Sequence, residues 1–136
     1  MSRVAVIGGG PAGIMAAAAA ADCGHDSVLL EKNEKLGKKL FLTGKGRCNI
    51  TNICDTDDFF ANIPRNPKFL YSALYGFSNT DIVELINANG VPTKAERGKR
   101  VFPASDKSSD VIKALTRHLN SSGAELRLNT EVSGIR

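Results

Sequence analysis

The stretch Arg3-Val4-Ala5-Val6-Ile7-Gly8-Gly9-Gly10-Pro11-Ala12-Gly13 decides the fold of this chain. Its first five residues form an apolar run rich in β-branched side chains, which is typical of a strand buried on both faces. The glycines interrupt the run, and the Ala-rich segment 11–22 favours a helix that ends at Gly24. Residues 27–31 form a second short segment with an apolar centre, which is typical of another strand. This order predicts a strand–helix–strand unit of about 30 residues, and hence a Rossmann-like α/β fold with a parallel sheet.

The spacing Gly8-x-Gly10-x-x-Gly13 is that of a dinucleotide-binding turn. In such turns the first glycine permits a tight turn, the second leaves room for a pyrophosphate, and the third lets helix and strand pack closely. The helix that begins at Pro11 and Ala12 offers unpaired N–H groups and about half a positive charge to phosphates. The alternative interpretation is a glycine-rich turn with only a packing role.

Glu31 ends the second strand, 18 residues after Gly13. An acid in this position accepts hydrogen bonds from the ribose hydroxyls of an adenosine. Its charge repels a 2′-phosphate, so NADP is the poorest candidate ligand for this site. The residues alone do not separate FAD from NAD. The long segment after Glu31 favours FAD, because a flavin extends further and needs covering.

The rest of the chain divides into three segments. Residues 32–66 show no sustained period and predict a long loop that covers the cofactor. Residues 67–122 predict a helical segment that contains a short hairpin, with two paired strands over 91–102 around Gly98. Residues 124–135 predict a returning strand, in which 131–135 continues 124–128 after a kink.

Three helices are expected in the helical segment, and each has its own end signals. The first covers 67–76, with Asn66 as its cap. The second opens with a capping box of Ser78 and Asp81 and ends at Asn89-Gly90. The third is capped by Ser108 or Ser109 and closes at Gly123.

Composition narrows the class of protein. The chain has 136 residues, of which 42% are hydrophobic and 24% charged, with three cysteines and a net charge of +4. No apolar run reaches the roughly 18 residues needed to span a bilayer, and no signal peptide precedes the first strand. The odd number of cysteines fits no disulfide framework. We therefore expect a cytoplasmic protein without a membrane partner.

Cations gather in one part of the sequence. Six lie between Lys32 and Arg47, against the single acid Glu34. Such an excess indicates either an anionic ligand, such as a phosphate, or a solvated loop. A nucleic-acid partner is not expected, because the segment lacks interleaved aromatic residues or a known recognition motif.

Two stretches carry a resemblance to a known family. They are the run Thr43-Gly44-Lys45-Gly46-Arg47-Cys48-Asn49-Ile50-Thr51-Asn52 and the run Gly98-Lys99-Arg100-Val101-Phe102-Pro103-Ala104-Ser105. Together with the glycine turn, they resemble the BaiN-like family of bacterial NAD(P)/FAD-dependent oxidoreductases, also described as aminoacetone-oxidase-like flavoproteins. Residues 123–135 resemble the strand that precedes the rest of that family's FAD domain.

The resemblance implies bound FAD and redox chemistry driven by a nicotinamide cofactor or by oxygen on a small-molecule substrate. The family's closing FAD segments have no counterpart in this sequence. We therefore expect an N-terminal part of a longer enzyme and an incomplete domain, served by a complementing C-terminal segment or by homo-oligomers. The alternative function is a nucleotide-binding module that is inactive by itself.

We predict that fifteen residues bind the cofactor: Gly8, Gly10, Pro11, Ala12, Gly13, Glu31, Lys32, Lys39, Thr43, Gly44, Gly46, Arg47, Cys48, Asn49 and Val132. Among these, Arg47 is expected to neutralise the pyrophosphate, and Val132 to bond adenine through its backbone. Asn49 is expected either to bond the flavin rim or to serve as a turn residue.

No catalytic side chain is assigned from the sequence. Cys48 beside Arg47 is a candidate for a redox thiolate. A buried, inert cysteine is the favoured interpretation, because flavin enzymes that relay electrons use a more closely spaced pair. His25 and His118 have no metal-ligand partner at helical spacing, so no metal site is predicted.

Overall fold

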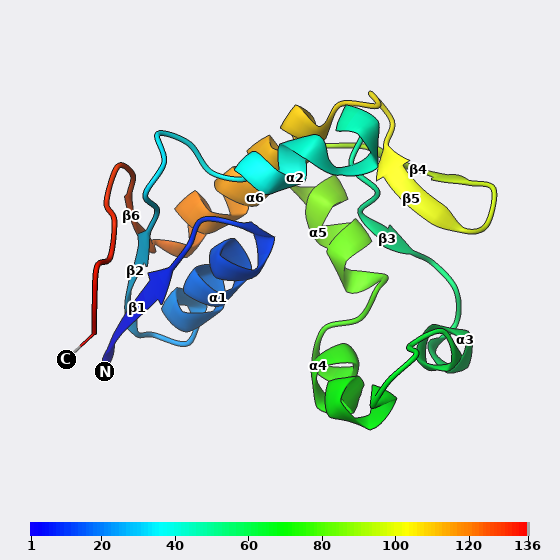
Figure 1. Cartoon of the computed structure of the whole chain (residues 1–136), viewed down its shortest axis with the longest axis horizontal. Helices are drawn as coiled ribbons and strands as arrows, with labels where there is room; N and C mark the ends of the chain where they lie inside the picture. Colours follow the sequence, from blue (N-terminus) through cyan, green and yellow to red (C-terminus); the bar gives the residue numbers. More distant parts are fainter. Residues whose placement is uncertain (136) are drawn as a thin grey trace.

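The structure is a computed structural model, and it describes residues 1–135. A parallel sheet carries two helices on one face, and a smaller antiparallel sheet and an arm of short helices lie beside them (Figure 1). The elements, in chain order, are β1 (Arg3–Ile7), α1 (Pro11–Asp22), β2 (Asp26–Leu30), α2 (Lys38–Leu42), the 3₁₀ turn η1 (Thr43–Gly46), β3 (Thr51–Asn52), α3 (Thr56–Ala61), the 3₁₀ turn η2 (Pro67–Leu70), α4 (Tyr71–Gly76), α5 (Asp81–Ala88), β4 (Thr93–Glu96), β5 (Arg100–Pro103), α6 (Ser108–Ser122) and β6 (Glu125–Arg127).

The parallel sheet has the strand order β1-β2-β6, with β2 in the centre. Ile7 pairs with Leu30 in register, so the carboxyl ends of β1 and β2 lie side by side. The inner face of the sheet packs on α1 and α6, and Leu29 and Leu119 are fully buried between these layers. The predicted Rossmann-like α/β fold is confirmed. No helix within residues 1–135 is long and apolar enough to cross a membrane.

Close backbone packing joins α1 to the end of β1. A Cβ atom placed on Gly13 would lie 1.9 Å from the Gly8 carbonyl oxygen, so no larger residue fits at this position. Gly8 itself has a φ of +102°, a conformation that L side chains rarely adopt. The two outer glycines of the motif therefore build the turn and the helix–strand contact, as predicted.

The second sheet has the order β3-β5-β4 and is antiparallel. β4 and β5 form the hairpin predicted over 91–102, and Gly98 has a φ of +78° in its turn. The capping box before α5 is also confirmed, because the Ser78 amide donates to Asp81 at 2.6 Å and the Asp81 amide donates to the Ser78 hydroxyl at 3.1 Å.

Several sequence-based expectations were wrong. Residues 32–66 contain two short helices, a 3₁₀ turn and a strand instead of one long loop. Lys107 is the residue before α6, and Ser108 is a buried helical residue that donates to the Phe41 carbonyl at 3.1 Å. Asn66 makes no side-chain cap and has a φ of +51°. The returning strand stops at Arg127, and residues 131–135 form no strand.

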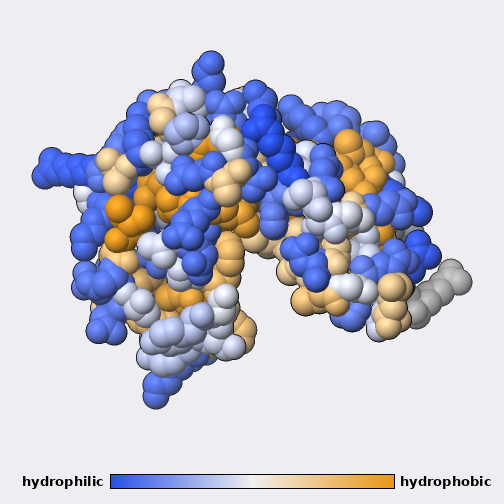
Figure 2. Space-filling view, turned by 180° about the vertical axis from the view of Figure 1, so that it is seen from behind, coloured by the Kyte–Doolittle hydropathy of each residue, from blue (hydrophilic) through white to orange (hydrophobic). Residues whose placement is uncertain are grey.

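An arm formed by α3, η2 and α4 projects away from the parallel sheet, and a notch separates the two parts of the surface (Figures 1 and 2). Aromatic rings hold this arm together, since Phe60 lies 4.4 Å from Tyr71 and 6.0 Å from Tyr75 between ring centroids. The expected helix over 67–76 is present, although its first turn is 3₁₀.

The Gly8–Gly13 contact yields a stability prediction. Gly13→Ala is expected to lower the free energy of unfolding by about 1–3 kcal/mol, because the added methyl overlaps the Gly8 carbonyl and forces α1 off β1. Gly76→Ala is the matched control, since a Cβ on this helical glycine meets nothing within 4 Å. Urea unfolding of the two variants measures the difference. Equal stabilities would contradict the packing role of Gly13.

Candidate functional site

A crevice of about 560 Å³ opens at the carboxyl ends of β1 and β2. This is the edge at which open α/β sheets bind their ligands. The glycine turn, the segment after β2 and the segment after β6 form its walls. Its lining residues are Ile7, Gly8, Gly9, Gly10, Ala12, Gly13, Leu30, Glu31, Lys32, Asn33, Lys38, Lys39, Thr130, Glu131 and Val132.

Gly10 keeps the crevice open at the start of α1. A Cβ on this residue would meet nothing within 4 Å, and its φ of −81° is accessible to any residue. The backbone therefore does not require glycine at this position, and its missing side chain leaves space in the crevice. α1 also begins with no side-chain cap and no acidic residue in its first turn. Its N-terminal N–H groups are thus available to an anion.

Glu31 is buried at the floor of the crevice, with 8% of its surface exposed. Its Oε2 accepts a hydrogen bond from the Gly9 amide at 2.6 Å, and its Oε1 accepts from the amide and the side chain of Asn33 at 2.7 and 2.5 Å. Burial raises the pKa of this carboxyl, but these hydrogen bonds and the charge of Lys32 outweigh burial and hold the pKa below its usual value. Glu31 is therefore an anion at neutral pH.

Cations line the rim of the crevice on one side. Lys32, Lys38 and Lys39 all border it. Lys38 is engaged by the protein, since its Nζ lies 2.9 Å from Glu34 and donates to Asn33 at 3.2 Å. None of the ion pairs within residues 1–135 involves Lys32 or Lys39. These two lysines can therefore give their charge to an anionic ligand.

The segment after β6 closes the third side of the crevice. The Thr130 amide donates to the Glu31 carbonyl at 2.9 Å, and the Asn129 amide donates to the Asn33 carbonyl at 3.0 Å. These bonds hold the chain against the end of β2, so that Val132 borders the crevice. The position predicted for adenine contact is thus at the crevice, although the expected strand is not formed there.

The structure brings eight of the predicted residues to the crevice, namely Gly8, Gly10, Ala12, Gly13, Glu31, Lys32, Lys39 and Val132. It does not place the other seven in the lining: Pro11, Thr43, Gly44, Gly46, Arg47, Cys48 and Asn49. Pro11 is the first residue of α1, directly beside the lining. The remaining six lie in η1, which follows α2, and in the three residues after it.

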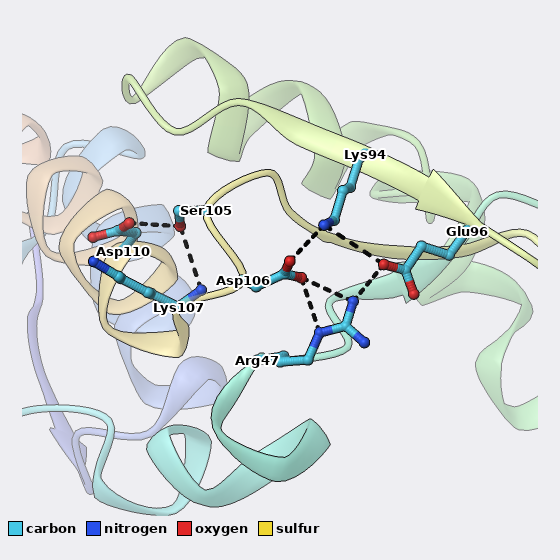
Figure 3. A network of polar contacts seen from close by, with 7 residues as sticks. All are labelled: Arg47, Lys94, Glu96, Ser105, Asp106, Lys107 and Asp110. Atoms are coloured by element: carbon cyan, nitrogen blue, oxygen red, sulfur yellow. Dashed lines mark hydrogen bonds and ion pairs between the residues drawn. The ribbon is translucent and has the colours of Figure 1, made fainter.

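Arg47 is bound by acidic side chains (Figure 3), and it is not among the residues that line the crevice. Its guanidinium donates to Asp106 at 2.9 Å and also pairs with Glu96, and it lies 4.2 Å from the centroid of the Phe102 ring. Lys94 joins the same network through Asp106 at 2.6 Å. The predicted neutralisation of a pyrophosphate by Arg47 would therefore require these contacts to break.

The turn around Arg47 has an unusual backbone. Gly44, Lys45, Gly46 and Cys48 all have positive φ, between +55° and +84°. The Arg47 network fastens this turn to the hairpin of β4 and β5 and to the loop before α6. We conclude that Arg47 holds a strained turn in place.

Cys48 is buried, with 2% of its surface exposed. Burial raises the pKa of its thiol, although a hydrogen bond with Thr43 opposes the shift. A raised pKa disfavours the reactive thiolate, so the favoured interpretation of an inert cysteine agrees with the structure. Within residues 1–135, no group of three or more His, Cys, Asp or Glu side chains is placed to hold a metal ion.

Comparison with known proteins agrees with this geometry. The family model described as the HI0933-like protein Rossmann domain matches residues 2–136. The chain belongs to this HI0933-like family. It is 33% identical over its whole length to a 3-dehydro-bile acid delta(4,6)-reductase of Clostridium scindens, and it covers 33% of that protein. It is 29% identical over 96% of its length to a ribosomal RNA dihydrouridine synthase of Escherichia coli, and it covers 32% of that protein.

Solved structures of other proteins share the fold of this HI0933-like chain. The Thermovibrio ammonificans THI4 structure matches 93% of the chain and 38% of its own chain, with a TM-score of 0.60 and 13% identity. An open flavocytochrome c3 fumarate reductase matches 94% of the chain and 27% of its own, with a TM-score of 0.59 and 22% identity. At these identities the likeness shows the fold alone. The chain spans about a third of the length of the curated relatives.

Sequence reasoning missed seven residues that line this crevice: Ile7, Gly9, Leu30, Asn33, Lys38, Thr130 and Glu131. Gly9 lies between the glycines of the motif, yet a Cβ there would meet the Leu36 side chain at 2.4 Å. Asn33 had a detectable signal, because an amide two residues after the acid can donate back to it, as in a local Asx-type contact. No sequence signal indicated Thr130, because its position depends on the pairing of β6 with β2.

The Arg47 network yields a prediction that depends on pH and salt. Hydrogen bonds from Lys94 and Arg47 lower the pKa of the Asp106 carboxyl. The network therefore stabilises the fold at pH values above the range in which an aspartate ordinarily titrates. Arg47→Met is expected to lower the thermal midpoint at neutral pH and low salt. The loss of thermal midpoint in this variant should become smaller as the pH falls through the lowered pKa of Asp106, and it should also become smaller at high salt.

Arg65→Met is the control for this experiment, because Arg65 is exposed and takes part in none of the ion pairs within residues 1–135. Thermal unfolding followed by circular dichroism measures both variants across pH. A loss of thermal midpoint for Arg47→Met that matches the control, or one that does not change with pH, would contradict the stabilising role of the Arg47 network.

Proposed function

We propose that this chain binds FAD, with the adenosine diphosphate part of the cofactor in the crevice at the end of β1. The observation that carries the proposal is the open space over Gly10, next to an uncapped helix N-terminus and opposite a buried carboxylate. A diphosphate would take the N–H groups of the first turn of α1, and Lys32 and Lys39 would offset its charge. Glu31 would accept a hydrogen bond from the sugar.

Glu31 also supplies the selectivity of this proposal. Because the carboxylate is held as an anion by Gly9 and Asn33, a 2′-phosphate on the adenosine would lie beside a fixed negative charge. The site therefore favours cofactors with a free ribose, such as FAD or NAD. The choice of FAD is supported by the resemblance to the BaiN-like flavoproteins and by the flavocytochrome c3 fumarate reductase among the structures that share this fold.

We further propose that the chain is the N-terminal part of an oxidoreductase of the BaiN-like kind. Such an enzyme would use NAD(P)H or oxygen and act on a small-molecule substrate. Support comes from the 3-dehydro-bile acid reductase among the relatives. FAD, when bound, supplies the hydride or electron transfer, while the residues of this chain bind and orient it. The chain spans about a third of that relative, and the activity of a whole enzyme is therefore part of this proposal.

The parallel sheet supports the need for a complementing segment. β1 lies at one edge of the β1-β2-β6 sheet, and its sequence is apolar after Arg3. Ile7 at its end is 53% exposed. After Arg3, this edge strand carries no charge or proline that would block pairing with another strand. We propose that a strand from a complementing C-terminal segment, or from a second copy of the chain, pairs there.

A non-catalytic nucleotide-binding module is the second candidate. One observation favours it: the turn from Thr43 to Asn49, expected at the flavin, does not line the crevice within residues 1–135. Purification distinguishes the two candidates. A yellow protein whose flavin absorption bleaches on addition of NAD(P)H indicates the oxidoreductase. A colourless protein that binds ADP indicates the module.

Two substitutions test the assignment of the crevice. Gly10→Val is expected to abolish FAD and ADP binding, because the side chain fills the space meant for the diphosphate. Glu31→Ala is expected to weaken binding by about 1–3 kcal/mol through loss of the hydrogen bond to the sugar. Gly76→Val is the control, since it also adds a side chain in open space but lies on α4.

Equilibrium dialysis with ADP and with FAD measures all three variants, and circular dichroism shows whether each is folded. If folded Gly10→Val and Glu31→Ala both bind like the unsubstituted chain, the crevice is not the nucleotide site.

A further inference from the structure

Most of the acceptor capacity of Glu31 is used by the protein itself. An ionised carboxylate has about four acceptor positions, two on each oxygen. Asn33 fills both positions of Oε1, through its amide N–H at 2.7 Å and its Nδ2 at 2.5 Å. The Gly9 amide fills one position of Oε2 at 2.6 Å. Among residues 1–135 these are the donors to the Glu31 carboxylate, so a single acceptor position, on Oε2, is left for a ligand.

Asn33 is itself held in one orientation. Its Oδ1 accepts from Lys38 Nζ at 3.2 Å, while its Nδ2 donates to Glu31. Rotating the amide by half a turn would set Nδ2 against the Lys38 ammonium and Oδ1 against the carboxylate, and both contacts would be repulsive. The Asn33 carbonyl is fixed by the Asn129 amide at 3.0 Å. The backbone and side chain of Asn33 are thus both tied in place at the crevice.

We propose that Asn33 is a positioning residue that restricts Glu31 to one acceptor position, so that this carboxylate binds one of the two ribose hydroxyls and not both. The inference rests on the proposed function, since it concerns the sugar of the same nucleotide. The inference goes beyond the proposed function, because it assigns the selectivity of Glu31 to Asn33, two positions further along the chain. Both Asn33 and Glu31 line the crevice, so the arrangement faces the ligand.

The proposal predicts how the site responds to the loss of the amide. In Asn33→Ala the backbone N–H remains, but Nδ2 is gone and one position of Oε1 becomes free. The second ribose hydroxyl then gains an acceptor. Selectivity between the two hydroxyls should therefore be strong in the unsubstituted chain and weak in the variant.

Calorimetric titration of the 136-residue chain with ADP, 2′-deoxy-ADP and 3′-deoxy-ADP tests this directly. In the unsubstituted chain, one deoxy analogue is expected to bind roughly ten-fold or more weaker than ADP, because it lacks a hydrogen bond to a charged group. The other analogue should bind like ADP. In Asn33→Ala, both analogues should bind more weakly than ADP does to the same variant.

Asn62→Ala is the matched control, because the Asn62 side chain also donates an amide hydrogen bond but lies at the end of α3, outside the crevice lining. It should keep the selectivity of the unsubstituted chain. A purely structural effect of Asn33→Ala would weaken ADP and both analogues by one common factor and leave the selectivity unchanged.

Three results would overturn the inference. The first is an equal loss for both analogues in the unsubstituted chain, which needs no variant to fold. The second is a folded Asn33→Ala variant that keeps the original selectivity. The third is a folded, unsubstituted chain that binds no ADP, and this result alone contradicts the proposed function as well.

Discussion

The backbone contact between Gly13 and Gly8 is the constraint on which the rest of the structure depends. Because no side chain separates them, the first turn of α1 lies directly against the end of β1. Its N–H groups therefore face the space at the carboxyl edge of the sheet. In this arrangement Gly10 and Glu31 border the same crevice.

A second link holds the opposite wall of the crevice. The Gly9 amide donates to Glu31, and the Gly9 carbonyl accepts from the Gly37 amide at 2.9 Å. The glycine turn is thereby bonded both to the end of β2 and to the start of α2. A Cβ on Gly37 would lie 2.8 Å from Ile112 of α6, so α2 in turn packs tightly on the core helix. The glycine turn is thus bonded to the end of β2 and, through α2, is connected to the core helix α6.

The sequence predicts the parts of the fold whose causes are local. The strand–helix–strand unit follows from apolar runs and glycine spacing, and Glu31 follows from its distance to that turn. The sequence does not predict the partners of Arg47, because Glu96 and Asp106 lie 49 and 59 residues further along the chain. A cation near the glycine motif suggests a phosphate ligand, yet in the fold its charge is balanced by these two acids.

Tertiary packing also explains the helix α2 and the start of α6. Five residues are too few for a stable isolated helix, so α2 depends on its contact with α6. Ser108 has the chemistry of a helix cap, but its hydroxyl donates to the Phe41 carbonyl, 67 residues earlier in the chain. In both places a distant partner prevails over the local signal. The same holds for Thr130, which reaches the crevice only because β6 pairs with β2.

The most direct test of this account is a titration of the ¹⁵N-labelled chain with ADP, followed by two-dimensional nuclear magnetic resonance. The amide signals of 8–10, 12–13, 31–33 and 130–132 are expected to shift together with one dissociation constant, while those of 43–49 change little. Shifts that are concentrated in 43–49, with none in the glycine turn, would place the nucleotide elsewhere and contradict the central claim.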